Sequence, residues 1–237
     1  MRKIVISGGS RGIGNAIAKK LLQEGHSVSL GIRNEDNLKN TILDPERNNF
    51  KNLILHKYNA IDKNSSKNWI EKTFEKFQNI DTIIHCAGVF NRTKLIFQDN
   101  EIGDIEYLWK VNVMGPWILT RDAWKYLSMS QSGRIIVLVS MSGKRSKSNL
   151  ASYSMSKFAL MSLCQTMRNE GWNKGIRVTA ICPGWVNTDM AKEINHFPKE
   201  DMSQTTDIAN ICSNLLQLPN SSVPFEIAFN CQLERTN

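Results

Sequence analysis

Short runs of β-branched residues alternate along the chain with segments whose apolar residues recur at helical spacing. Strands are predicted over residues 3–6, 28–32, 53–58, 82–85, 134–139, 177–181 and 226–229. Between the first two runs, Ile13, Ile17 and Leu21 recur at helical spacing before Gly25, and a similar pattern covers residues 69–77. Strands that alternate with helices predict an α/β fold, with a parallel sheet covered by helices.

One domain is expected over residues 1–237. The length lies within the range that α/β folds occupy as one unit, and no repeat, low-complexity tract or shift in composition divides the chain. Two polar regions, residues 34–52 and 195–206, are expected to form peripheral loops.

Composition narrows the class of protein. Apolar residues make up 41% and charged residues 22% of the chain, a balance typical of globular proteins. The amino-terminal apolar run ends at once in Ser7 and Gly8, so a strand is favoured over a signal peptide. No stretch approaches the roughly 18 apolar residues of a membrane span. Five widely spaced cysteines without a C-x-x-C pair indicate a reduced compartment, so a cytoplasmic protein is expected.

The net charge of +8 does not by itself indicate nucleic acid as a partner. Lysines and arginines are scattered, and no stripe of basic and aromatic residues is present. Binding to nucleic acid or to a membrane is therefore not expected, and no metal site is predicted.

A glycine-rich segment, SGGSRGIG at residues 7–14, separates the first strand from the first helix. Its spacing G-x-x-x-G-x-G differs by one residue from the dinucleotide fingerprint. Such glycines let the backbone approach a pyrophosphate, which N–H groups at the helix N-terminus bind. A tight turn is the alternative, but the position after the first strand favours a phosphate site made of Gly8, Ser10, Arg11, Gly12, Ile13 and Gly14.

The second predicted strand ends without the carboxylate that normally reads a ribose 2′-hydroxyl. Arg33 follows it, and Arg11 lies in the glycine segment. Both could bind a 2′-phosphate, because guanidinium matches phosphate in geometry and charge. Ordinary surface arginines are the alternative. The pattern predicts that NADP(H) is favoured over NAD(H).

Tyr153 and Lys157 lie at positions i and i+4 of a predicted helix and project from one face. A nearby ammonium favours phenolate, so we expect the pKa of Tyr153 to be lowered, which makes it a proton donor or acceptor. Ser140 ends the fifth strand, at the sheet edge where open α/β proteins bind ligands, and could bind a substrate oxygen. A surface pair and a serine that satisfies local backbone are the alternatives.

A proline interrupts the helical segment predicted over residues 101–128. Pro116 has no N–H, so the carbonyl of Asn112 loses its helical partner and is expected to bind a water that leads to Lys157. A simple kink is the alternative.

Taken in this order, these residues resemble the compact branch of the short-chain dehydrogenase/reductase family over nearly the whole chain. The stretch PGWVNT at residues 183–188 adds to the resemblance. It implies a Rossmann-type, doubly wound, seven-stranded parallel sheet with NAD(P) along its carboxyl edge. The implied catalytic residues are Asn112, Ser140, Tyr153 and Lys157, with a proton relay from Tyr153 through ribose and Lys157 to water. The further implied cofactor-binding residues are Asn59, Ala60, Ala87, Gly88, Tyr153, Lys157, Pro183, Gly184, Val186 and Thr188.

The chain departs from the family pattern at three places. His85 and Cys86 stand where the family often has two asparagines, which alters the hydrogen bonding behind the cofactor. Asn59 replaces a common aspartate near the adenine but keeps an acceptor. The tail at residues 227–231 lacks the glycine ending of many relatives, which puts the family's tetramer contact in doubt.

The function indicated is an NADP(H)-dependent oxidoreductase that moves a hydride between nicotinamide and a carbonyl or alcohol, with Tyr153 as acid/base. A catalytically weak NADP(H)-binding sensor or interaction protein is the alternative, although such a protein would not need the four catalytic residues. A sugar-nucleotide epimerase or dehydratase is less favoured by the chain length and the glycine spacing.

Substrate identity stays open. Residues 189–207 are the candidate lid, so a compact substrate is expected, and the helices over residues 101–128 and 152–171 are expected to pair with symmetric copies in a homodimer or homotetramer. Trp109, Trp117 and Trp124 could support that interface or a buried core. Candidate substrate contacts are the apolar Phe90, Met141, Leu150, Trp185 and Met190 and the cationic Arg92, Lys94, Lys144 and Arg145.

Overall fold

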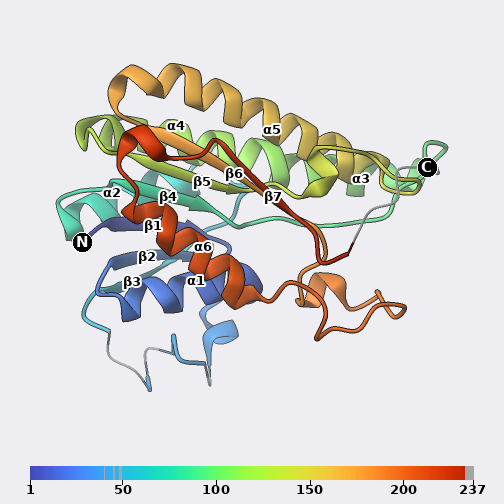
Figure 1. Cartoon of the computed structure of the whole chain (residues 1–237), viewed down its shortest axis with the longest axis horizontal. Coiled ribbons are helices and arrows are strands. Elements are labelled where there is room, and N and C mark those ends of the chain that lie inside the picture. Colours follow the sequence, from blue (N-terminus) through green and yellow to red (C-terminus); the bar gives the residue numbers. More distant parts are fainter. Residues whose placement is uncertain (40, 45, 48–49, 233–237) are drawn as a thin grey trace.

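The computed structural model describes residues 1–39, 41–44, 46–47 and 50–232, and in this part of the chain seven parallel strands form one sheet (Figure 1). Their order across the sheet is β3-β2-β1-β4-β5-β6-β7, so the direction of winding reverses between β1 and β4. The doubly wound Rossmann-type fold is thereby confirmed. The strands are β1 (Lys3–Ser7), β2 (Ser27–Ile32), β3 (Leu53–Lys57), β4 (Thr82–His85), β5 (Arg134–Leu138), β6 (Arg177–Pro183) and β7 (Glu226–Phe229).

Helices cover both faces of the sheet and bury two apolar cores. On one face lie α1 (Gly12–Gln23) and α6 (Thr205–Gln217), and on the other lie α2 (Ser65–Phe77), α4 (Gly115–Met129) and α5 (Ala151–Gly171) (Figure 1). Because successive side chains of a strand point to opposite faces, Ile4 and Ile6 enter the first core whereas Val5 enters the second.

The register brings three strand ends to the same edge. Ser7, the last residue of β1, pairs with Gly31 of β2 on one side and with His85 of β4 on the other. Ligands bind outside the carboxyl ends of such strands, at the point where the strand order reverses. A ligand site is therefore expected at this edge.

The predicted helical segment over residues 101–128 is divided. A 3-10 turn, Asp99–Glu101, and α3 (Ile102–Trp109) lead into a π-helical turn at Lys110–Met114, and α4 follows with Pro116 in its first turn. Gly115 N–H donates to the Lys110 carbonyl five residues earlier. The interruption predicted at Asn112 is thus a π turn within a continuous helical rod.

Two predicted loops differ from expectation. The region at residues 34–52 includes residues 40, 45, 48 and 49, which lie outside the described residues, but Leu38 and Leu43 of this region are fully buried in the core. The candidate lid is shorter than predicted, because α6 already begins at Thr205 and a bridge between Val186 and Ser203 closes its base. Residues 187–203 are called the β6–α6 loop below.

The described part of the chain contains no helix that combines the length and hydrophobicity needed to cross a membrane. All five cysteines lie in this part and are free thiols, three of them buried.

Candidate active site

A cleft of about 650 Å³ lies at the carboxyl edge of the sheet. The loop between β1 and α1 forms one wall, the ends of β2 and β3 and the segment after β4 form its floor, and the β6–α6 loop closes the far side. The volume is in the range typical of cofactor sites. The cleft brings together these predicted cofactor residues: Gly8, Ser10, Arg11, Gly12, Ile13, Gly14, Arg33, Asn59, Ala60, Ala87, Gly88 and Thr188.

The glycine loop has the shape that a pyrophosphate requires. Gly8 has a φ of +76°, and a Cβ atom there would lie 2.6 Å from backbone atoms of Ala87. At Gly14 a Cβ atom would lie 2.5 Å from the Gly8 carbonyl oxygen. Helix α1 starts with no side-chain cap from any described residue and no acidic residue in its first turn. Its first N–H groups therefore remain available to an anion, as a dinucleotide site needs.

Two arginines, Arg11 and Arg33, line the cleft near the carboxyl end of β2. Ile32 ends β2 as a buried apolar residue, and the exposed Arg33 places Nη1 3.5 Å from the Tyr107 hydroxyl. Arg11 forms an ion pair with Asp189 of the β6–α6 loop, with Nη1 3.1 Å from Oδ2. The Arg11 side chain is 72% exposed, so this pair contributes little to stability and yields easily to a stronger anion.

The pocket beyond Arg33 is lined by residues that sequence reasoning missed. Tyr107 and Val111 lie four residues apart near Asn112, and helical spacing alone was enough to place them on one face. For Tyr58, the only indication in the sequence that it lines the cleft was its position directly before Asn59. The Asn59 side chain accepts from Ile61 N–H at 3.4 Å, so its acceptor serves the local turn. The other lining residues not predicted to bind cofactor are Gly31, Ile32, Cys86, Val89, Phe90, Asp189, Met190, Lys192 and Glu193.

Tyr153 and Lys157 lie buried on one face of α5, next to Ser140 at the end of β5. Ser140 has a φ of +129°, accepts from Ser142 N–H at 3.1 Å and hydrogen-bonds the Tyr153 hydroxyl. Lys157 Nζ donates to the Leu138 carbonyl at 2.9 Å. A non-glycine residue with such a φ is uncommon and marks a position held by its surroundings, as at many functional sites.

Asn112 joins the π turn to the segment after β4. Its side-chain oxygen accepts from Val89 N–H and its amide donates to the Val89 carbonyl, each at 2.9 Å. The amide also reaches Ser156 Oγ at 3.2 Å, and a Cβ atom on Gly88 would lie 3.4 Å from the Asn112 oxygen. Asn112 therefore links the cleft floor to α5 through its side chain, whereas the prediction had concerned its carbonyl and a water.

Burial sets the protonation of the two catalytic candidates. It raises the pKa of Tyr153 to about 12, although the hydrogen bond with Ser140 acts in the opposite direction. It lowers the pKa of Lys157 to about 8. The expectation that the ammonium would lower the phenol pKa was wrong for this state, because desolvation of the phenolate outweighs other effects. At neutral pH, Tyr153 is a neutral phenol and Lys157 is mostly charged.

His85 and Cys86 occupy the positions where the family often has asparagines. His85 is buried, its Nε2 lies 2.8 Å from Thr120 Oγ1, and burial lowers its pKa to about 3. Burial likewise raises the pKa of the Cys86 thiol to about 12. Both groups are therefore neutral beside the cleft.

Among the predicted cofactor residues of α5 and of residues 183–188, only Thr188 lines the cleft. Pro183, Gly184, Val186, Tyr153 and Lys157 lie outside its lining. A Cβ atom on Gly184 would lie 2.0 Å from the Asn230 side chain, so this glycine allows the tail to approach β6. Trp185 packs edge-on against His196 and Phe197 within the β6–α6 loop.

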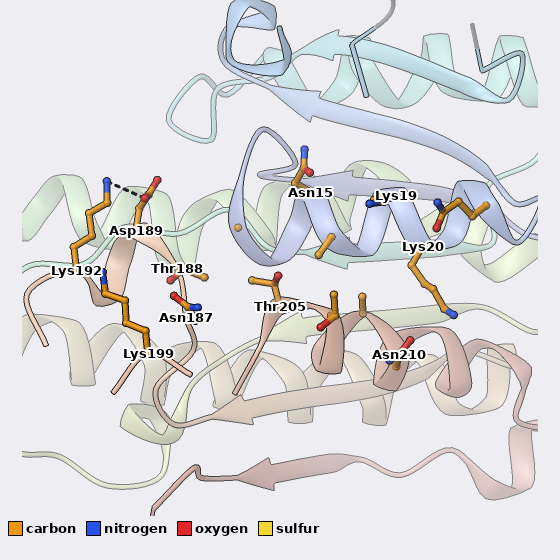
Figure 2. Close-up of a pocket in the computed structure, with 15 residues that line it drawn as sticks. Asn15, Lys19, Lys20, Asn187, Thr188, Asp189, Lys192, Lys199, Thr205 and Asn210 are labelled. Atoms are coloured by element: carbon orange, nitrogen blue, oxygen red, sulfur yellow. Dashed lines mark ion pairs between the residues drawn. The ribbon is translucent and has the colours of Figure 1, made fainter. Parts of the chain in front are cut away.

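A second hollow of about 730 Å³ runs between α1 and α6 (Figure 2). It shares Gly12, Thr188, Asp189 and Lys192 with the cleft, and Lys192 Nζ lies 2.9 Å from Asp189 Oδ1. Other lysines around it are Lys19, Lys20 and Lys199. The hollow therefore adjoins the cleft at Gly12 and at the start of the β6–α6 loop.

The sequence matches the short chain dehydrogenase family model over residues 2–199. Agropine synthesis reductase of Rhizobium rhizogenes is 35% identical over 217 residues, which cover 92% of this chain and 49% of the reductase. The chain thus spans about half the length of that relative. The 3-oxoacyl-(acyl-carrier-protein) reductase FabG of Rickettsia typhi is 30% identical over 203 residues, with coverage of 84% of this chain and 79% of the relative.

Solved structures share the fold. An alcohol dehydrogenase from the archaeon Thermococcus sibiricus, complexed with 5-hydroxy-NADP, has a TM-score of 0.86 at 24% identity and covers both chains completely. ElxO with NADP bound has a TM-score of 0.85 at 22% identity, with 98% of each chain covered. The doubly wound sheet and the family match over residues 2–199 lead to one conclusion: the chain belongs to the short-chain dehydrogenase/reductase family of oxidoreductases.

Proposed function

We propose that this protein reduces a small carbonyl compound with NADPH and that Tyr153 donates the proton. The observation that carries the proposal is the state of Tyr153. It is a buried, neutral phenol that hydrogen-bonds Ser140 and shares a helix face with the Lys157 ammonium. A group with this protonation is ready to act as an acid in carbonyl reduction.

The residues present fit a dinucleotide. The glycine loop would hold its pyrophosphate, Asn59 and Ala60 would lie near its adenine, and Ala87 and Gly88 allow its close approach to the cleft floor. On the nicotinamide side we place Tyr153, Lys157, Pro183, Gly184, Val186 and Thr188. When bound, reduced nicotinamide supplies a hydride to the carbonyl carbon.

Residues of this chain bind the carbonyl oxygen and transfer a proton to it. Ser140 binds the carbonyl oxygen, and Tyr153 transfers its hydroxyl proton to that oxygen as the carbon receives the hydride. The phenolate left on Tyr153 is stabilised by the Lys157 ammonium, which lies 5.7 Å from the ring centroid. Asn112 positions the Val89 backbone and Ser156 around this pair. The products are an alcohol and oxidised nicotinamide, so hydride and proton balance.

The preference for NADP(H) rests on charge at the adenine side of the cleft. Arg11 and Arg33 line it, and no carboxylate ends β2. Relatives with NADP in their structures share the fold, and two relatives by sequence are named reductases, which supports the reductive direction.

The test is Tyr153→Phe, assayed with a panel of ketones and aldehydes. The change removes the transferable proton while the ring stays, so turnover should fall by at least about 100-fold, the low end for general acid catalysis. NADPH affinity, measured by titration, should change much less. Wild-type turnover in the variant would exclude Tyr153 as the proton donor.

A further inference from the structure

A line of contacts leads from Tyr153 through Phe90, which lines the cleft, to the cation of Arg92. The Phe90 ring meets the Tyr153 ring edge-on, with centroids 4.9 Å apart. The Arg92 guanidinium carbon lies 5.6 Å from the Phe90 centroid. One aromatic ring therefore separates the group that protonates a carbonyl oxygen from a permanent positive charge.

The guanidinium of Arg92 is held only weakly. Its Nε lies 3.5 Å from Oε2 of Glu193 in the β6–α6 loop, and the two side chains are 53% and 77% exposed. It forms no hydrogen bond with any other described residue, whereas a guanidinium can bind a carboxylate with two parallel hydrogen bonds. An exposed ion pair of this kind contributes little to stability, so a ligand anion can replace Glu193 without a large cost.

The surroundings of Arg92 favour an anion. The segment after β4 carries Lys94 two residues beyond Arg92, and the segment after β5 carries Arg145, Lys147 and Lys144, which forms an ion pair with Glu226 at 2.6 Å. The two segments lie side by side, since Thr93 and Leu150 form a bridge and Thr93 Oγ1 lies 2.7 Å from Ser152 Oγ. Ser152 directly precedes Tyr153, so the segment that carries Arg92 is fixed relative to the proton donor.

We infer that the substrate is an oxo acid, in which a short apolar chain that packs on Phe90 separates the carbonyl from a carboxylate that binds Arg92. The inference rests on the proposed carbonyl reduction and names the substrate class for the same site. Glu193 occupies the carboxylate position until the substrate displaces it. The carboxylate itself is chemically unchanged, because hydride and proton are added only at the carbonyl.

The experiment compares an oxo acid with its uncharged methyl ester at saturating NADPH. Suitable pairs are 4-oxopentanoate and 6-oxoheptanoate with their esters, and the readout is the ratio of kcat/KM for acid over ester. The wild type should favour the acid by at least about 10-fold, as expected for a charge-assisted hydrogen bond. Arg92→Ala should bring the ratio close to unity, and Arg92→Lys should give an intermediate ratio.

Two further variants sharpen the test. Glu193→Gln removes the competing carboxylate and should lower KM for the acid several-fold without the same effect on the ester. Lys76→Ala removes an exposed cation in the last turn of α2, outside the cleft lining, as a control and should keep the wild-type ratio. A phosphonate analogue of the oxo acid reports whether the site prefers carboxylate, and a preference for the phosphonate would overturn that part of the inference.

The outcomes separate this inference from the proposed function. Equal use of acid and ester by the wild type, or an unchanged ratio in Arg92→Ala, would overturn the role of Arg92 while carbonyl reduction stands. If no ketone is reduced, the proposed function fails, and calorimetric binding of the oxo acid to wild type and Arg92→Ala still decides whether Arg92 binds the carboxylate.

Discussion

At the scale of single residues, burial governs the chemistry of the site. The i, i+4 spacing of Tyr153 and Lys157 was readable from the sequence and placed both on one face of α5. Their pKa values were not, because desolvation depends on packing between α5, β5 and the π turn, which no local pattern reports. The structure reverses the expected direction for the Tyr153 pKa, so Tyr153 keeps its proton at neutral pH, although the raised pKa also makes it a weaker acid.

The lowered pKa of Lys157 predicts a pH dependence. The ammonium is present below its pKa of about 8 and is lost above it. Because kcat/KM reports groups of the free enzyme, kcat/KM for NADPH should fall as pH rises through about 8. Lys157→Arg keeps its charge and should move any remaining fall to higher pH. A flat profile from neutral pH to well above the Lys157 pKa would contradict this assignment.

His85 predicts a pH dependence of stability. Its pKa is lowered from 6.5 to about 3 in the folded protein, so the neutral form is favoured there. Its contribution is complete above pH 6.5 and is lost as the pH falls from 6.5 toward about 3. The free energy of unfolding should decrease by about 1.4 kcal/mol for each pH unit in that window.

Urea unfolding at neutral pH and at one pH unit below 6.5, the pKa of His85 in the unfolded chain, measures this loss in wild type and in His85→Asn. The variant removes the titrating ring and should show a smaller decrease. His26 and His56, whose pKa values burial also lowers, remain in both proteins and set the common background. Equal decreases in the two proteins would show that His85 is not responsible.

At the scale of elements, periodicity predicted which strands and helices form but not the residues at which each one ends. All seven strands and the main helices follow from apolar spacing, but β6 extends to Pro183 and β3 ends before Tyr58. The π turn at Lys110–Met114 was visible only as a proline after Asn112, since an i to i+5 hydrogen bond has no signature of its own. The short β6–α6 loop depends on a bridge between Val186 and Ser203, which is a tertiary contact.

We expect cofactor preference to depend on two arginines, Arg33 after β2 and Arg11 in the loop before α1. Arg33→Ala should weaken NADPH by about 10-fold to 100-fold and affect NADH little, because only NADPH carries the 2′-phosphate. Exposure of Arg33 and added salt should move the effect toward the lower end. Titration of both cofactors into wild type and variant is the measurement.

Arg47→Ala is the matched control, since Arg47 is exposed but lies outside the cleft. It should leave both affinities at wild-type values. Equal wild-type affinities for NADPH and NADH, or equal losses in Arg33→Ala, would show that Arg33 does not read the phosphate.

At the scale of the whole molecule, two helices on the same side of the sheet, α4 and α5, carry exposed apolar side chains. Trp117 of α4 is 56% exposed, and Met155 and Phe158 of α5 are 58% and 44% exposed, whereas Trp124 packs against the core. The sequence left these tryptophans open between core and interface, because helical spacing does not tell which face a neighbour covers. We propose that α4 and α5 form the interface of a homodimer.

Trp117→Glu combined with Phe158→Glu should convert that dimer to a monomer. Buried aromatic residues at interfaces contribute at least about 2 kcal/mol when removed, so the dissociation constant should rise by at least about 30-fold. Light scattering at micromolar concentrations gives the mass. Leu95→Glu, at an exposed apolar position outside both helices, should leave the mass unchanged. A monomeric wild type would contradict the proposed dimer.

The central claim is that this whole arrangement moves a hydride to a carbonyl carbon while Tyr153 supplies the proton. NADPH carrying deuterium at C4 of the nicotinamide, one face at a time, tests it most directly when mixed with the ketone panel and the oxo acids. Mass spectrometry should find one deuterium on the carbinol carbon with one labelled face only, formed at least about 100-fold more slowly by Tyr153→Phe. No labelled alcohol from wild type with NADPH bound, or an equal rate in Tyr153→Phe, would contradict it.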